Sequence, residues 1–307
     1  MGSDVFYTYI VDNNFWDFKI RQKEEEGYFA LAESFAEQIM RGSFSSAMEQ
    51  AFRKLLEYYG DDPIIVRSSS ILEDGFGNAF AGKYESVFCS NEGSPEEKLQ
   101  AFEQAVRTVY ASTVSISALD YRKRRGLDQL DEQMALLIQR VSGSRYEGFF
   151  MPCAAGVGYS DSPYRLGVSH PEAGMLRLVA GLGTAAVDRR TDSYPRIAIL
   201  DNPSKVMMST SSEKRQYSQR TIDIIRNTNA VVESVPCEEI YKKLPSYLVH
   251  LLFSRDWETE SFFREHGISR EILYTSCEGL VKNRALMSDM KEIRISKIGY
   301  GQVPPPR

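Results

Sequence analysis

The sequence contains an apolar run that ends in side chains of the kind that bind phosphate. Residues 64–66 are Ile-Ile-Val, typical of a buried strand, and Arg67 and three serines follow at once. A guanidinium offers a fixed fork of donors to phosphate oxygens, and serine hydroxyls such as that of Ser68 can complete the contact. Arg67 and Ser68 are therefore candidate anion-binding residues. The alternative is a solvated arginine beside a serine-rich surface turn.

A second apolar run, residues 134–141, carries an amide near its end. The run reads Met-Ala-Leu-Leu-Ile-Gln-Arg-Val, and its continuity predicts a central strand buried on both faces. Gln139 could meet a ligand in an apolar slot with a few polar partners. It could equally satisfy neighbouring backbone groups.

A glycine turn precedes a third polar group. Gly181 and Gly183 allow a tight turn and a close approach of backbone to a phosphate. Asp188, Arg189 and Arg190 follow the turn. The alternative interpretation of these three residues is a solvated charged turn.

Composition limits the class of protein. The chain has 307 residues, 42% hydrophobic and 26% charged, which is ordinary for a globular protein of one large or two smaller domains. Its net charge of −5 argues against general nucleic-acid binding. The four cysteines are widely spaced, which favours reduced thiols in the cytoplasm. We expect no signal peptide and no membrane-spanning segment.

The pattern of apolar residues and caps predicts four regions. Residues 1–60 are expected to be helical, 61–205 to form an α/β core, 206–298 to form short helices, and 299–307 to be a tail. Residues 94–97, Ser-Pro-Glu-Glu, predict a helix start with a capping box. The basic run 122–125 is interpreted as a solvated helix face.

Several of these segments together resemble one family. Val-Arg-Ser-Ser at 66–69, Glu-Asp at 73–74, Phe-Ala-Gly at 80–82 and Tyr-Arg at 121–122 are similar to the nucleotide-binding domain of phosphoenolpyruvate synthase and pyruvate phosphate dikinase. The likeness covers residues 60–205 well and fades from Ser204 onward. It implies an ATP-grasp-like domain, here followed by a helical C-terminal region, with ATP and Mg²⁺ as ligands.

The resemblance also implies roles for single residues. Arg67 and Arg190 would contact phosphates, and Gln139 would meet the adenine base. Asp188 would be the magnesium ligand, since Mg²⁺ prefers oxygen donors. Leu176 and Thr184 stand where the family carries glutamates, which implies a weaker metal site.

Some family features have no counterpart in the sequence. No Gly-Gly-Lys-Gly loop precedes Arg67, and neither an acidic I-E-W or I-E-F strand nor a Q-x-R-P strand is evident after residue 205. The phosphohistidine domain and the phosphoenolpyruvate-binding barrel are absent as well. We therefore expect a fragment of a longer phosphotransferase that passes a phosphoryl group from ATP to a histidine on another domain, and from there to pyruvate. Weak or no turnover is expected of this chain alone. The alternative is a non-catalytic regulatory or interaction module that retains the fold.

Overall fold

The computed structural model describes residues 1–73, 82–160, 173–187, 190, 193–206, 208–226, 232–283 and 286–287. The chain divides into two compact units. Unit 1 comprises Met1–Val141 with Arg226–Val231, and unit 2 comprises Ser142–Ile225 with Val232–Arg307. The division after Val141 falls inside the range 61–205 that was expected to form one core.

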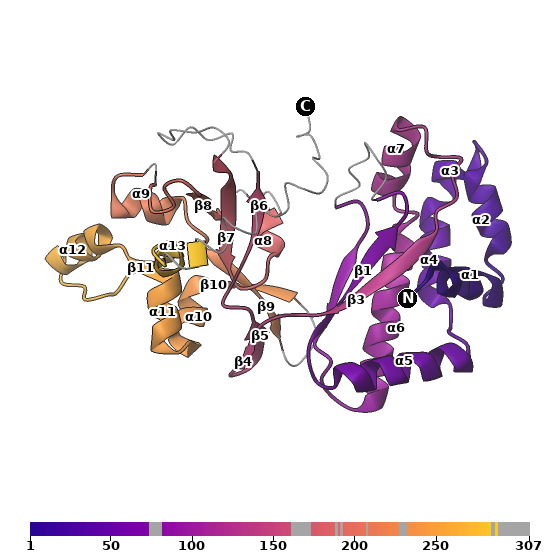
Figure 1. The fold of residues 1–307 in the computed structure, drawn as a ribbon, viewed down its shortest axis with the longest axis horizontal. Helices are drawn as coiled ribbons and strands as arrows, with labels where there is room; N and C mark the ends of the chain where they lie inside the picture. The colour runs from indigo at the N-terminus through magenta and orange to yellow at the C-terminus, as the bar shows by residue number, and fades with distance from the viewer. Residues whose placement is uncertain are drawn as a thin grey trace. The chain divides into compact units, whose positions relative to one another are not determined.

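Unit 1 is a small antiparallel sheet backed by helices (Figure 1). Its strand order is β2-β1-β3, so β1 is central. The strands are β1 (Ile64–Ser70), β2 (Ser86–Cys89) and β3 (Met134–Arg140). The helices are α1 (Ser3–Asp12), α2 (Trp16–Lys23), α3 (Gly27–Ala30), α4 (Ala32–Arg41), α5 (Ser46–Tyr59), α6 (Pro95–Ser112) and α7 (Ile116–Arg124).

The helices of unit 1 cover one face of the sheet because their apolar sides meet the alternate residues of the strands. Ile64 and Val66 of β1 and Met134 and Leu136 of β3 are buried in one core with aromatic side chains of α1, α5 and α6. Phe102, at the centre of α6, is fully buried in this core. The outward-facing residues of the same strands are left uncovered by this core.

The predicted start of α6 is confirmed. The Ser94 hydroxyl accepts from the Glu97 backbone N–H, and the Glu97 carboxylate accepts from the Ser94 N–H. This capping box satisfies two backbone donors that the helix itself leaves unpaired.

Among the described residues, unit 2 contains three sheets. One has the order β6-β7-β8, with β6 (Ala154–Tyr159), β7 (Met175–Ala180) and β8 (Arg196–Ile199). The second has the order β10-β9-β5-β4, with β4 (Ser144–Tyr146), β5 (Phe149–Met151), β9 (Thr221–Arg226) and β10 (Val232–Pro236). The third pairs β11 (Phe253–Arg255) with β12 (Leu273–Thr275).

Short helices complete unit 2. They are α8 (Thr184–Val187), α9 (Ser211–Gln216), α10 (Cys237–Ile240), the 3-10 helix η2 (Tyr241–Lys243), α11 (Ser246–Leu252), α12 (Trp257–Glu265) and α13 (Glu278–Val281). Buried residues of β5, β9, α10 and α11, among them Phe149, Ile222 and Leu252, form its largest core.

Two expectations about the elements require correction. Residues 206–298 are not only helical, because β9 to β12 lie within them. The run 134–141 is not a central strand buried on both faces: among the described strands β3 pairs only with β1, and Leu137 is 44% exposed. Apolar content alone cannot separate these two arrangements, since Leu137 is apolar but faces outward. The mixed α/β class is confirmed.

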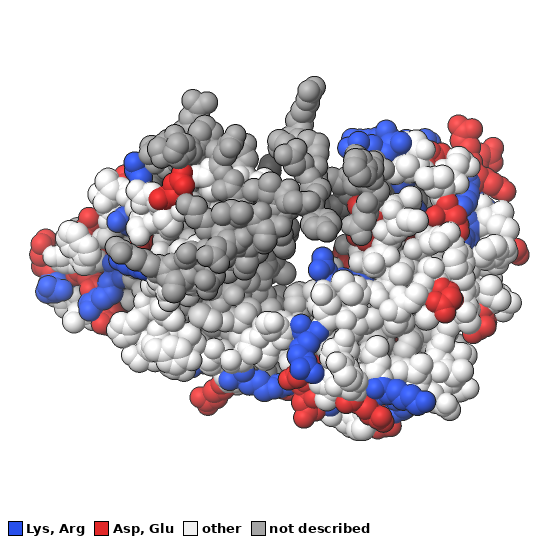
Figure 2. Space-filling view, in the orientation of Figure 1, with Lys and Arg blue, Asp and Glu red and all other residues white. Residues whose placement is uncertain are grey.

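No helix among the described residues combines the length and the apolar character required to cross a membrane. On the face drawn in Figure 2, basic and acidic side chains lie mostly toward the margins, and much of the described surface is uncharged.

Candidate functional site

The uncovered face of the β2-β1-β3 sheet brings Arg67 and Gln139 together. The register places Ile65 opposite Gln139 and Arg67 opposite Leu137, so the side chains at 65, 67, 137 and 139 share one face. The Arg67 Nη1 donates to Gln139 Oε1 at 3.4 Å. These two candidates, 72 residues apart in sequence, are therefore direct neighbours.

Apolar side chains make up the rest of this face. Leu137 is exposed, and Ile65 and Phe88 are half-buried. Phe88 of β2 lies opposite Ile65, so it belongs to the same face. Within the part of the chain that the structure describes, Arg67 makes no ion pair. We call residues 65, 67, 88, 137 and 139 the open sheet face; it offers a flat apolar surface beside one unpaired cation and one amide.

Ser68 does not join Arg67. Successive strand residues point to opposite faces, and Ser68 lies on the face away from Arg67. Its hydroxyl donates to Glu73 Oε1 at 2.8 Å, and Glu73 also accepts from the Ser70 N–H at 3.0 Å. Ser69, not Ser68, is on the side of Arg67. The predicted cradle of Arg67 with Ser68 is thus divided by the strand.

A buried carboxylate holds the end of β1. Glu132 is 4% exposed and accepts from the Ser70 and Tyr84 hydroxyls and, at 3.4 Å, from Arg122 Nη1. The Arg122 Nη2 also donates to the Thr113 carbonyl. Arg122 is therefore a buried partner of Glu132, and the interpretation of run 122–125 as a solvated face is wrong at this residue. Residues 74–81, including the Phe-Ala part of the Phe-Ala-Gly segment, lie outside the described residues.

In unit 2, Arg190 forms a bidentate ion pair with a fully buried carboxylate. Arg190 Nη2 and Nη1 lie 2.6 and 3.0 Å from the two carboxylate oxygens of Asp223, which has 0% exposure. The Thr184 and Ser234 hydroxyls also donate to this carboxylate. Asp223 was not among the predicted site residues.

The hydrogen bonds to Asp223 set its charge. Burial alone raises the pKa of the carboxyl, but the bonds from Arg190, Ser234 and Thr184 outweigh burial and hold its pKa below the usual range. Asp223 is thus a carboxylate whose lone pairs are already engaged.

The glycine turn packs directly on this cluster. Gly181 has φ +78°, and its backbone pairs with Asp223. A Cβ at Gly181 would lie 2.6 Å from the Asp223 carbonyl oxygen and 2.5 Å from Ile222 Cγ2. The turn therefore requires glycine both for its left-handed backbone and for the close approach of β9.

The described residues contain no cluster of metal-binding side chains. None of their acidic, histidine and cysteine side chains form a group of three or more that could hold a metal ion. The Asp223 carboxylate is occupied by a guanidinium and two hydroxyls, and Leu176 is buried among apolar side chains. Asp188, the predicted ligand, lies outside the described residues and stays a prediction.

Two strands that the sequence analysis did not predict lie beyond residue 205. Strand β9 carries Ile222-Asp223-Ile224, an acid between apolar residues, and β10 pairs with it and ends at Pro236. The isoleucines of residues 221–226 were the sequence signal for strand β9. Short helices had been predicted for this stretch.

Comparison with known protein families gives a match that also reaches past residue 205. A sequence model of the family described as pyruvate phosphate dikinase, AMP/ATP-binding domain, matches residues 2–247. The match continues through β9 and β10, past residue 205 where the likeness had been expected to fade. The chain is also 32% identical over 117 residues to a phosphoenolpyruvate synthase of Aeropyrum pernix. That alignment covers 38% of this chain and 14% of the synthase.

Proposed function

Because the chain belongs to the family of the pyruvate phosphate dikinase AMP/ATP-binding domain, we propose that it binds an adenine nucleotide and that the open sheet face receives it. The observation that carries this proposal is the contact between Arg67 and Gln139 on an uncovered apolar strand surface. An adenine ring is flat and apolar with polar edges, and it is attached to an anionic chain.

Each side chain of the open sheet face then has a part in binding. Leu137 and Phe88 pack against the base, and the Gln139 amide meets its polar edge. Arg67 donates to a phosphate oxygen with charge-assisted hydrogen bonds. Its bond to Gln139 at 3.4 Å is long, so exchanging it for a phosphate contact has a small cost.

Arg190 is a weaker candidate for phosphate binding than Arg67. A phosphate would have to compete with the Asp223 carboxylate for the same donors. We propose that Arg190 contributes less to nucleotide affinity than Arg67 does, and that its main part is to neutralise the buried carboxylate.

For the whole protein, we propose a phosphotransferase of the phosphoenolpyruvate synthase and pyruvate phosphate dikinase type. In such a protein the bound ATP would pass a phosphoryl group to a histidine on another domain, and the open sheet face would position the nucleotide for this transfer. The alignment with the Aeropyrum pernix synthase covers only a small part of that enzyme, 14% of its length.

A second candidate is a module that binds nucleotide without turnover. Two observations favour it. The carboxylate oxygens of Asp223 already accept hydrogen bonds and are not open to Mg²⁺. Leu176 is a buried apolar side chain and has no oxygen ligand to offer. The two candidates share nucleotide binding and differ in the requirement for a metal and in turnover.

Isothermal titration with ATP and AMP tests the shared claim. We expect saturable binding of both nucleotides. Arg67→Ala should weaken ATP binding at least tenfold and AMP binding by less, because ATP has more phosphate oxygens for the arginine to contact. Arg41→Ala, which removes an exposed arginine of α4, is the matched control. Absence of binding, or equal affinities for the Arg67 and Arg41 variants, would refute the proposal.

Turnover separates the two candidates. The titration is repeated with Mg²⁺ and with chelator, and ATP consumption is followed in the presence and absence of the metal. Equal ATP affinity in both conditions with no consumption supports the module, whereas metal-dependent affinity supports the phosphotransferase.

A further inference from the structure

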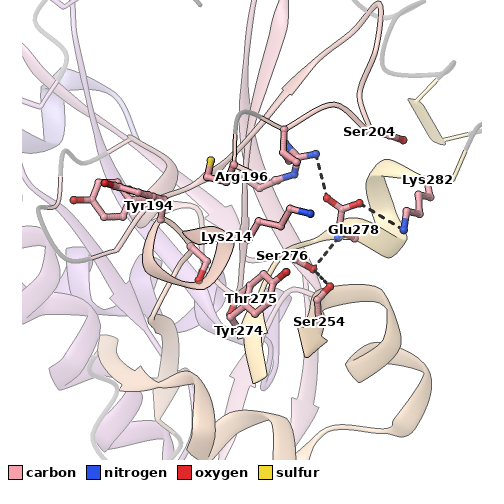
Figure 3. A pocket seen from close by; sticks show the side chains of 14 residues that line it. Tyr194, Arg196, Ser204, Lys214, Ser254, Tyr274, Thr275, Ser276, Glu278 and Lys282 are labelled. Atoms are coloured by element: carbon pink, nitrogen blue, oxygen red, sulfur yellow. Dashed lines mark hydrogen bonds and ion pairs between the residues drawn. The ribbon is translucent and has the colours of Figure 1, made fainter. Parts of the chain in front are cut away.

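Unit 2 contains a cavity of about 340 Å³ that is separate from the open sheet face (Figure 3). It is lined from β8, α9, β11, β12 and α13. Its size is at the lower end of the range for small-molecule sites in proteins. Part of its wall, from Ser254 to Lys282, lies beyond residue 247, where the family match ends. The cavity therefore is not a feature of the AMP/ATP-binding domain as such.

The lining is positively charged. It includes the cations Arg196, Lys214 and Lys282 and a single carboxylate, that of Glu278. Three positive charges against one negative charge leave an excess of two. A phosphate monoester carries a charge of about −2 at neutral pH.

Arg196 supplies a fixed positive charge at one wall. Its side chain is 11% exposed, and its Nη2 lies 3.2 Å from Glu278 Oε1 and donates to the Pro203 carbonyl at 3.0 Å. Burial lowers the pKa of Arg196 and the Glu278 carboxylate opposes that change. Its Nε is buried and has no partner among the described residues. Because the Glu278 carboxylate is already paired with Arg196, it only partly neutralises the other cations of the cavity.

Lys214 is the cation available to a ligand. Its side chain points into the space between Arg196, Ser276 and Glu278 (Figure 3). Within the described chain its ammonium group makes no hydrogen bond or ion pair, whereas Lys282 lies 3.7 Å from Glu278. Lys214 is half-buried, so a ligand would meet a partly desolvated charge.

Hydroxyl groups and aromatic rings surround these charges. Ser254 and Ser276 share a hydrogen bond of 2.7 Å at the base of the cavity. Tyr194 and Tyr217 form an edge-to-face pair with centroids 5.8 Å apart, and both rings are partly exposed. Such rings favour an aromatic group stacked beside them.

From this combination we infer that the cavity is a second ligand site, which binds a small phosphate monoester carrying an aromatic ring. The phosphate accepts from Lys214 and the serine hydroxyls, and the ring lies against the tyrosines. The site is independent of nucleotide binding at the open sheet face.

Titration of the full chain with phenyl phosphate tests this inference. We expect saturable binding of one molecule, weaker binding of inorganic phosphate, and at least tenfold weaker phenyl phosphate binding by Lys214→Gln. Lys243→Gln, an exposed lysine of η2 outside the cavity, should bind like the parent chain. Arg67→Ala should also retain phenyl phosphate binding.

The inference fails if the parent chain does not bind phenyl phosphate at millimolar concentration, or if the Lys214 and Lys243 variants bind it equally. If inorganic phosphate bound as tightly as phenyl phosphate, the proposed contact between the ligand's ring and the tyrosines would be excluded. If Lys214→Gln does not fold, Lys282→Gln serves instead, because Lys282 is 68% exposed. That variant should weaken binding about threefold, and hydrogen exchange of residues 273–282 should slow when phenyl phosphate binds.

Discussion

Removing the guanidinium of Arg122 should destabilise unit 1 far more than an exposed arginine on the same helix would. The side chains of Arg122 and Glu132, taken without their backbone atoms, are 7% and 5% exposed, and Arg122 Nη1 lies 3.4 Å from Glu132 Oε2. Arg122→Met leaves the Glu132 carboxylate buried with only two hydroxyl donors, and it removes the donor to the Thr113 carbonyl. Breaking a buried pair in this way costs about 3–5 kcal/mol. That is a large share of the roughly 5–15 kcal/mol that stabilises a typical domain.

The two tryptophans allow the loss to be assigned to a unit. Trp16 lies in α2 of unit 1 and Trp257 in α12 of unit 2, and the chain has no others. Urea unfolding at pH 7 is followed by fluorescence in a Trp257→Phe background, where Trp16 reports unit 1 alone. Arg122→Met should lower the free energy of unfolding by about 3–5 kcal/mol.

A matched control and a double variant test the reasoning. Arg124 pairs with Asp120 on the surface of α7, at 77% and 44% exposure, so Arg124→Met should cost about 0.5 kcal/mol or less. Arg122→Met with Glu132→Leu should cost less than the sum of the single changes, by about 2 kcal/mol, since no charge is left buried. A loss below about 1 kcal/mol for Arg122→Met, or strict additivity in the double variant, would refute the account of this cluster.

Two further predictions concern unit 2 and are read from Trp257 in a Trp16→Phe background. Gly181→Ala should cost about 3 kcal/mol in unfolding free energy, because its Cβ would meet β9 and its φ is positive; an unchanged urea midpoint would contradict the turn described here. The second concerns pH: the folded state holds the pKa of Asp223 below its unfolded value, about 3.9, so its stabilisation is present above that pH and lost as pH falls. Asp223→Asn should therefore be less stable than the parent at pH 7, with a difference that shrinks below about pH 4; a constant difference would contradict it.

Local signals were read correctly from the sequence. The capping box at Ser94 depends on residues three apart in the chain, so its spacing alone predicts where α6 begins. The strand at Ile64 was also evident, because a short apolar run next to a polar cluster is a local pattern.

Features that depend on the pairing of distant segments could not be predicted from local sequence patterns. Whether Leu137 faces the core or the outside depends on the register of β3 against β1, 70 residues away in the chain. Ser68 was grouped with Arg67 by adjacency, but strand alternation places neighbours on opposite faces.

The buried carboxylate of Asp223 was missed for a related reason. Its partners come from two distant segments: Thr184 and Arg190 follow the glycine turn, and Ser234 lies in β10. Only the pairing of β9 with β10 and with the glycine turn brings them together. The alternation of isoleucines around it was the available clue.

Photolabelling with 8-azido-ATP tests the central claim most directly, because the azide reports where the base lies. If the open sheet face binds adenine, peptides that contain β2 or β3 will carry the label, and excess ATP will suppress it. Label confined to unit 2, or label that excess ATP does not reduce, would contradict the assignment of Arg67 and Gln139 to a nucleotide site.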